Sequence, residues 1–314
     1  MNRLALRPYI RPVGINVQAA DTASAYNQAV QTYAAYADGS PEDLFSFAGH
    51  HAYADRCVWS VLDAKLHALR DTGATSVSIL DAGCGPGMWT RRLVTRASDL
   101  GFSSITARGF DVAQVQIRLA RRNAKDLKRI PGVNLNFDVA DLEEPMPEWD
   151  ASVDITVCLY SVLSHLPPAS MPRTVMELAR VTRGSFITTV RAVGSMPTVC
   201  VDSVNAARDF RLDHDLDRCD IEFHDGRRLA LPFHLFTPDE LRGCFAERFD
   251  IEDLCGLDLF HGRFSPDARW NPASHGFDLR LSEVLGELER KYARDQSMIE
   301  WANHLLLVAR PRNG

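Results

Sequence analysis

Between residues 76 and 190, short apolar stretches alternate with amphipathic ones, and this alternation constrains the fold more than any other feature. The apolar stretches are Ser76–Leu80, Ile105–Phe110, Val133–Val139, Ile155–Leu159 and Phe186–Val190. Stretches with helical periodicity separate them, at Met88–Asp99, Ala113–Lys128 and Met171–Val181. Short apolar strands separated by helices are typical of a parallel sheet that is covered on both faces. The pattern predicts an α/β fold with a doubly wound sheet.

Beyond residue 190 the chain adds two predicted strands, Phe249–Leu254 and His304–Ala309, which bring the expected sheet to seven strands. A helix is predicted to begin after Thr237. Thr caps helices, Pro238 suits the first helical position, and Glu240 completes a capping box.

Two long segments, 191–236 and 256–303, interrupt this last part of the chain. In the first, Asp225-Gly226 lies between two alternating apolar stretches and predicts a hairpin with a type I′ turn. The second contains an amphipathic helix around Leu279–Tyr292. Because long connections often carry specificity elements, we expect the two insertions to form a substrate lid.

The N-terminal part, residues 1–72, is predicted to be a helical cap with helices at Thr22–Ala37 and Tyr53–Leu69. Apolar side chains recur there every three or four positions, as in amphipathic helices. Residues 73–314 then form the main domain with its two insertions.

A glycine-rich run joins the first predicted strand to the first helix. Residues 78–87 read Ser-Ile-Leu-Asp-Ala-Gly-Cys-Gly-Pro-Gly, and glycines at such a turn let the backbone approach a ligand closely. A P-loop, which binds nucleoside triphosphates, is disfavoured. That motif needs Gly-Lys-Ser/Thr after its glycine-rich part, and this chain has Met88-Trp89-Thr90 there. The dinucleotide pattern GxGxxG fails as well, since Met88 occupies its last glycine position. The observed pattern is GxGxG, with Asp81 two residues before the first glycine.

This pattern resembles motif I of the class I S-adenosylmethionine-dependent methyltransferases, of the type that acts on small molecules. The resemblance extends to acidic residues near the predicted strands, namely Asp111, Asp138, Asp141 and Asp154. It implies a seven-stranded Rossmann-like methyltransferase sheet, an enzyme, and S-adenosylmethionine as the cofactor.

The resemblance also implies roles for individual residues. Asp111 would accept both ribose hydroxyls, Asp141 the adenine amino group, and the amide of Leu142 would lie near a ring nitrogen. Asp81 would order the loop or reach the amino group of the cofactor through water. For Asp154, a role at the site and a purely structural role in a cap or loop stay open. The residues expected to bind the cofactor are Asp81, Gly83, Cys84, Gly85, Gly87, Asp111, Val112, Asp141, Leu142 and Leu159.

The acceptor is expected beside the fourth strand, because ligands of open parallel sheets bind outside the carboxyl ends of the strands. Tyr160 and His165 are the catalytic candidates there. His165 has the pKa of a general base, but it could equally hold the loop by hydrogen bonds. The residues expected to contact the acceptor are Tyr26, Tyr33, Ser161, Arg191, Ser203 and Arg208.

Composition narrows the substrate class. The formal net charge of -6 argues against a nucleic-acid partner and favours a small-molecule substrate. The 7 cysteines include no CxxC pair, which favours reduced thiols over a disulfide framework or a metal cluster. No stretch approaches the ~20 apolar residues of a membrane span, so we expect a cytoplasmic protein without a membrane partner. A homodimer stays open.

The sequence favours methyl transfer from S-adenosylmethionine to oxygen or nitrogen of a small metabolite. Two alternatives remain. A reshaped pocket could cyclise or cleave the cofactor and release methylthioadenosine, or the protein could bind the cofactor without catalysis.

Overall fold

The structure is a computed structural model that describes residues 22–27, 44–47, 52–195, 207–213, 215–264 and 279–312. Its main sheet has seven strands in the order β3-β2-β1-β4-β5-β10-β9. All neighbouring strands pair in parallel except that β10 is antiparallel to β5 and β9. The strands are β1 (Ser76–Ala82), β2 (Ser104–Asp111), β3 (Val133–Val139), β4 (Val153–Cys158), β5 (Thr182–Arg191), β9 (Phe249–Leu257) and β10 (His304–Pro311). The predicted fold class and all seven strands are confirmed.

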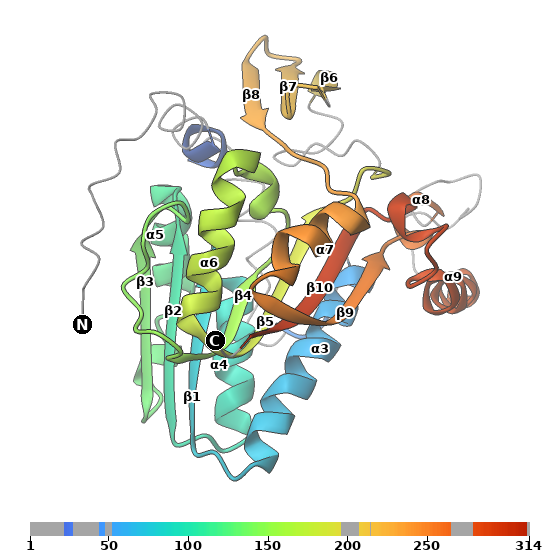
Figure 1. The fold of residues 1–314 in the computed structure, drawn as a ribbon. Helices are drawn as coiled ribbons and strands as arrows, with labels where there is room; N and C mark the ends of the chain where they lie inside the picture. Colours follow the sequence, from blue (N-terminus) through green and yellow to red (C-terminus); the bar gives the residue numbers. More distant parts are fainter. Residues whose placement is uncertain are drawn as a thin grey trace.

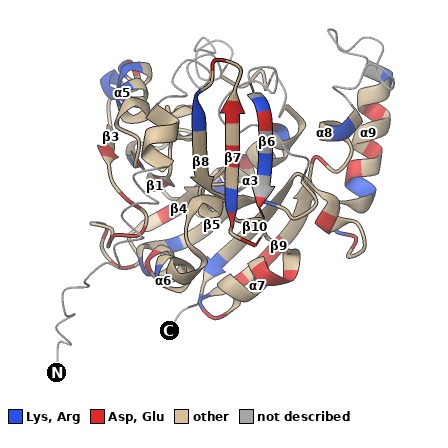
Figure 2. Ribbon diagram, turned by 90° about the horizontal axis from the view of Figure 1, so that it is seen from above, with Lys and Arg blue, Asp and Glu red and all other residues tan. Residues whose placement is uncertain are grey.

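Helices cover both faces of this sheet, as a doubly wound fold requires (Figure 1). Figures 1 and 2 together place α6 and α7 on one face, and α3 and α5 on the other. The capping box predicted at Thr237 is present, with the Glu240 amide donating to the Thr237 hydroxyl. The larger helices are α3 (Ala52–Asp71), α4 (Met88–Asp99), α5 (Gln114–Asn123), α6 (Met171–Val181) and α7 (Pro238–Ala246), and the short 3-10 turns are η2 (Leu127–Arg129), η3 (Leu163–His165) and η4 (Pro168–Ser170).

One helix is shorter than its sequence pattern predicts. The helix expected over Ala113–Lys128 ends at Asn123, and η2 follows as a separate turn. The Ala124 amide still donates to Ala120, but the Ala124 backbone has left helical geometry. The basic residues of this stretch gave no stop signal, which explains the error.

The main hydrophobic core lies between the sheet and its helices and includes the fully buried rings of Phe110, Phe137 and Phe186. Val58, Leu62 and other apolar residues of α3 belong to this same core. α3, predicted as part of the N-terminal cap, therefore packs against the core of the main domain. The domain boundary at residue 72 stays a prediction.

The carboxyl ends of the parallel strands and the beginning of β10 share one edge of the sheet. His304, the first residue of β10, pairs with Arg191 at the end of β5 and with Leu257 at the end of β9. This edge, here called the carboxyl edge, also holds the glycine loop after β1 and the loop after β4. It is where the sequence analysis expects cofactor and acceptor.

The first insertion forms a separate antiparallel sheet above the carboxyl edge (Figure 1). Its strands are β6 (Ala207–Asp213), β7 (Arg218–Phe223) and β8 (Arg228–Pro232). The predicted hairpin is present, but the type I′ turn is wrong. Phe223 pairs with Arg227 across a short loop, and only Gly226, at φ 84°, has a positive φ there. A type I turn followed by a left-handed glycine matches this pattern.

This small sheet has its own apolar cluster, which includes Ile221, Phe223, Leu231 and Phe233. Ala25, from the helical residues 22–27, is part of the same cluster. Residues 22–27 and the small sheet therefore pack together above the carboxyl edge. Residues of both charges lie along the strands of the small sheet (Figure 2).

The second insertion contains α8 (His261–Phe264), α9 (Leu279–Tyr292) and η6 (Ile299–Trp301). The buried carboxylate of Glu289, on α9, accepts the backbone amides of Leu259, Phe260 and His261 and so fixes the start of α8. Burial raises the pKa of Glu289 to about 7. Among the described residues, no helix is long and apolar enough to cross a membrane.

Candidate active site

The glycine loop after β1 takes a backbone path that side chains resist. Gly83, Gly85 and Gly87 have φ values of 77°, 50° and 80°, in the left-handed region that glycine tolerates best. The amides of Gly83 and Cys84 both donate to the Phe110 carbonyl, at 2.8 and 2.9 Å. The loop is thereby tied to the end of β2.

The three glycines meet different surroundings. A Cβ on Gly83 would lie 2.4 Å from a methyl carbon of Val162, and one on Gly87 would press on Ala120 and Phe137 at 3.0 and 3.1 Å. Among the described residues, a Cβ on Gly85 would meet no atom within 4 Å. Gly83 and Gly87 are therefore needed for packing, whereas Gly85 borders open space.

Asp111, at the end of β2, lies beside that open space. Its carboxylate accepts the Gly85 amide at 2.9 Å and the Ala113 amide at 2.8 Å. Burial raises the pKa of this carboxyl, and the two amides oppose the rise. A carboxylate has about four acceptor sites, so two backbone bonds leave capacity for a further donor.

Asp81 is buried, with only 2% of its surface exposed. Its Oδ2 accepts the Thr90 hydroxyl at 2.5 Å, which links the end of β1 to the first turn of α4. Burial raises the pKa of Asp81 to about 7. These contacts favour the loop-ordering role among those expected for Asp81. The neighbouring Cys84 is also buried, and burial raises the pKa of its thiol.

The acidic residues further along the chain divide into two groups. Asp141 follows β3 at the carboxyl edge and accepts the Glu143 amide at 2.9 Å, while the next residue, Leu142, is buried. Asp154 lies at the beginning of β4, hence at the opposite edge, and binds the Ser78 amide and Arg183. Of the two roles left open for Asp154, these contacts support the structural one. Asp138 is paired with Arg108.

The loop after β4 holds strained backbone. Tyr160 and Ser161 have φ values of 54° and 69°, which cost energy for residues with a side chain. Their amides donate to Thr189, at 2.6 Å to its hydroxyl and 3.1 Å to its carbonyl. Two residues further on, Val162 packs against Gly83. The loop after β4 and the glycine loop are therefore in direct contact.

His165 is buried at the end of this loop, and both ring nitrogens are engaged. Nδ1 lies 2.9 Å from the Pro232 carbonyl, which only accepts, so Nδ1 carries the proton of the neutral ring. Nε2 then accepts the Tyr26 hydroxyl at 2.6 Å. Burial lowers the pKa of His165 to about 4. These contacts support a role in holding the loop and the small sheet; a role as general base stays a prediction.

Tyr160 stands between three other groups. Its ring stacks on Trp89 with centroids 6.0 Å apart and meets His304 edge-on at 5.6 Å. Its hydroxyl donates to the buried carboxylate of Asp55, on α3. Sequence reasoning missed Asp55. An acidic residue in the first turn of a helix is ordinary, so only the contact with Tyr160 distinguishes it.

The remaining predicted residues are spread over the edge and beyond it. Leu159 is buried at the end of β4, and Val112 follows Asp111 with partial exposure. Arg191 is buried at the end of β5, where its guanidinium lies 3.4 Å from His304. Arg208, on β6, is exposed and pairs with Glu222. Tyr33 and Ser203 lie outside the described residues.

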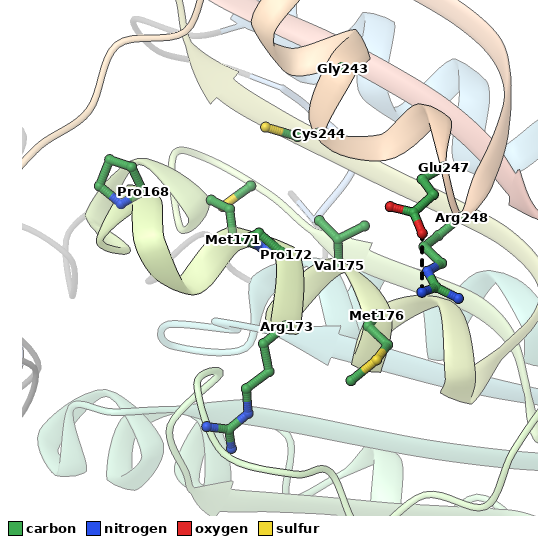
Figure 3. A pocket seen from close by; sticks show the side chains of 10 residues that line it. All are labelled: Pro168, Met171, Pro172, Arg173, Val175, Met176, Gly243, Cys244, Glu247 and Arg248. Carbon is green, nitrogen blue, oxygen red and sulfur yellow. Dashed lines mark ion pairs between the residues drawn. The ribbon is translucent and has the colours of Figure 1, made fainter. Parts of the chain in front are cut away.

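A groove lies between α6 and α7 (Figure 3). Its volume is about 430 Å³, and Met171, Val175 and Cys244 line it together with Arg173 and Arg248. Of the residues predicted for cofactor or acceptor, none that the structure describes lines this groove.

Known proteins match the part of the chain that contains the glycine loop and Asp111. The family model of a methyltransferase domain matches residues 79–185, from β1 to β5. Residues 79–185 are therefore a methyltransferase domain. The ubiquinone biosynthesis O-methyltransferase of Bordetella parapertussis is 26% identical over 113 residues, which are 36% of this chain and 42% of that protein. The chain thus aligns with less than half the length of this curated relative.

Solved structures resemble the chain over a longer range at lower identity. The complex of DhpI with SAH is 15% identical, covers 95% of this chain and 98% of its own, and has a TM-score of 0.49. Geranyl diphosphate C-methyltransferase from Streptomyces coelicolor A3(2) is 15% identical over 79% of this chain and 80% of its own, with a TM-score of 0.44. Neither likeness carries an argument about the acceptor of this chain.

Proposed function

We propose that the chain transfers a methyl group from S-adenosylmethionine to an oxygen or nitrogen atom of a small metabolite. The observation that carries this proposal is the open space at Gly85 beside the Asp111 carboxylate. A side-chain-free turn next to a carboxylate with spare acceptor capacity suits a ribose that has two hydroxyls.

The chain's own residues fit this cofactor. The glycine loop would lie under the methionine and ribose portions, and Asp111 would accept the ribose hydroxyls. Asp141 and the amide of Leu142 would hold the adenine, since both lie at the carboxyl edge after β3. S-adenosylmethionine supplies, when bound, a methyl group on a sulfonium that a nearby nucleophile can take.

The acceptor half of the site would be the loop after β4 with its surroundings. Tyr160, Ser161 and Arg191 lie there, and Tyr26 reaches the same loop through His165. Methyl transfer depends largely on alignment of acceptor and sulfonium, so rigid positioning by this loop suffices for much of the rate. We keep the expectations of a small-molecule acceptor and of a cytoplasmic protein as part of this proposal.

Product analysis tests the proposal. The full chain is incubated with S-adenosylmethionine, with and without pooled candidate metabolites, and the nucleoside products are identified by mass spectrometry. We expect S-adenosylhomocysteine only when an acceptor is present, and no methylthioadenosine above the uncatalysed background. Enzyme-dependent methylthioadenosine without a second substrate would instead assign cyclisation or cleavage of the cofactor.

A further inference from the structure

The Asp55–Tyr160 contact joins a helix of the N-terminal part to the loop after β4. Asp55 is 2% exposed, on the first turn of α3, and accepts the Tyr160 hydroxyl. The chain separates the two residues by 105 positions. Burying a carboxylate is costly unless it is paired.

Arg92 completes the pairing of Asp55. Its guanidinium lies 4.0 Å from the second carboxylate oxygen, and both side chains of the ion pair are buried. The same guanidinium lies 4.6 Å from the Phe47 ring centroid and 4.5 Å from that of Trp89. Arg92 also donates from Nε to the Leu44 carbonyl at 2.8 Å. The carboxylate that accepts the Tyr160 hydroxyl is thus also part of a buried ion pair.

This contact fixes the hydrogen-bonding character of Tyr160. A phenol has one proton, and an ionised carboxylate can only accept. Because the proton of Tyr160 goes to Asp55, its oxygen offers only lone pairs to any other group. The ring is partly exposed, and it stands at the carboxyl end of β4, two residues from the Val162 that touches Gly83.

The hydroxyl of Tyr26 has the same character. Since Nδ1 of His165 donates to Pro232, Nε2 can only accept, and the Tyr26 proton is directed to it. The loop from Tyr160 to His165 thus orients two phenols, each with its proton directed to a partner that only accepts. Groups that only accept favour ligands that donate.

We infer that Asp55 is a positioning residue, whose carboxylate accepts the Tyr160 hydroxyl proton and so turns it away from the ligand, and that the methyl acceptor is a molecule whose hydroxyl or amine N–H donates to the Tyr160 oxygen. An ether, an ester or a tertiary amine lacks that donor and would be rejected. The inference rests on the proposed function and narrows its substrate class. A donated hydrogen also turns the acceptor atom so that a lone pair stays free for the methyl group.

Binding selectivity tests this inference without turnover. The full chain, saturated with S-adenosylhomocysteine, is titrated with phenol, benzyl alcohol and methoxybenzene by saturation-transfer NMR. We expect the two donors to bind wild type about tenfold more tightly than the ether, as a hydrogen bond to a partly buried acceptor implies. Donors that fail to bind wild type at millimolar concentration overturn the inference.

Two variants separate positioning from mere support of the fold. Tyr160→Phe removes the oxygen and should reduce the donor preference to about twofold or less. Asp55→Asn is nearly isosteric, and its amide can donate to the phenol, which frees the Tyr160 proton to point at the ligand. The donor preference should then vanish or reverse in favour of methoxybenzene. Tyr292→Phe, a phenol on α9, should leave the preference unchanged.

A donor preference that persists in both Tyr160→Phe and Asp55→Asn would overturn the inference. Should Asp55→Asn fail to fold, Tyr160→Phe alone decides, because it leaves the Asp55–Arg92 pair intact. Calorimetric titration of the wild type with S-adenosylhomocysteine distinguishes a failure of the proposed function from a failure of this inference. No binding contradicts the proposed function, whereas binding without the selectivity change contradicts this inference alone.

Discussion

His165 illustrates how burial decides what a single residue does. Its two hydrogen bonds, to Pro232 and Tyr26, fix one neutral tautomer and join the loop after β4 to the small sheet and to residues 22–27. His165 lies in the loop after β4, at the carboxyl edge where the sequence predicted it. The sequence could not decide whether His165 acts as a general base or holds the loop by hydrogen bonds. That distinction depends on Pro232 and Tyr26, which lie 67 and 139 positions away in the chain.

The low pKa of His165 predicts a pH-dependent stability. Its folded-state pKa of about 4 lies below the unfolded value of ~6.5. The unfolded state therefore binds the proton more tightly, and this contribution to stability is present above pH ~6.5 and is lost as the pH falls toward 4. Urea unfolding of wild type and His165→Gln from pH 7.5 to 4.5 measures it. The advantage of wild type should shrink by about 2 to 3 kcal/mol over that range.

A constant difference between wild type and His165→Gln across these pH values would contradict the assigned tautomer and burial. The raised pKa values of Asp81 and Glu289 act in the opposite direction, since burial favours their protonated forms. They are present in both proteins and cancel in the comparison. The difference therefore reports on His165 alone.

At the scale of elements, alanine substitutions at Gly83 and Gly85 of the glycine loop can be compared. Both residues have a positive φ, but a Cβ would meet different surroundings at each. The added methyl of Gly83→Ala would lie 2.4 Å from Val162, whereas that of Gly85→Ala would meet no atom of the described part of the chain within 4 Å. We expect Gly83→Ala to lower the free energy of unfolding by about 2 to 4 kcal/mol, and Gly85→Ala by about 1 kcal/mol.

Cofactor affinity should follow a different order. A methyl group on Gly85 projects into the space assigned to the cofactor, so calorimetry should show S-adenosylhomocysteine binding at least about tenfold weaker while the protein stays folded. If Gly85→Ala binds like wild type, the open space is not the cofactor site. Gly83→Ala, which should destabilise the fold more than Gly85→Ala does, shows how far a loss of stability alone lowers the affinity for S-adenosylhomocysteine.

The elements themselves were largely predictable. Strands buried on both faces give continuous apolar stretches, and β4, with every residue buried, is the clearest example. By contrast, β6 was missed, because Ala207–Asp213 carries charges at four of its positions and pairs on only one side, with β7. Its partner strand lies further along the chain, which a local pattern does not reveal.

At the scale of the whole molecule, the net charge predicts which partners are absent. With a formal charge of -6, the chain should lack the counterion-release term that drives nucleic-acid binding. Fluorescence polarisation with labelled RNA and DNA at physiological salt should show no appreciable binding. Submicromolar affinity that falls steeply with added salt would move the acceptor class to nucleic acid.

The residues of the candidate site that lie close together in the sequence could be predicted, whereas those that only packing brings together could not. The glycine loop and Asp111 follow from motif and spacing within one β/α unit. Asp55 and Arg92 could not be found, because their importance arises only when α3 and α4 pack side by side at the carboxyl edge. Arg208 was predicted as one of several polar residues of the first insertion that contact the acceptor, and the structure places it exposed on the small sheet.

Calorimetric titration with S-adenosylhomocysteine tests the central claim, a cofactor site built by the glycine loop and Asp111, most directly. Wild type and the exposed control Asp126→Asn should bind alike. Asp111→Asn should bind about 1.5 to 3 kcal/mol more weakly, because the charge-assisted contact to the ribose is lost and a donating NH2 group replaces one of the two oxygens that accept the Gly85 and Ala113 amides. Equal affinity of folded Asp111→Asn and wild type, or no binding by wild type, would contradict the account.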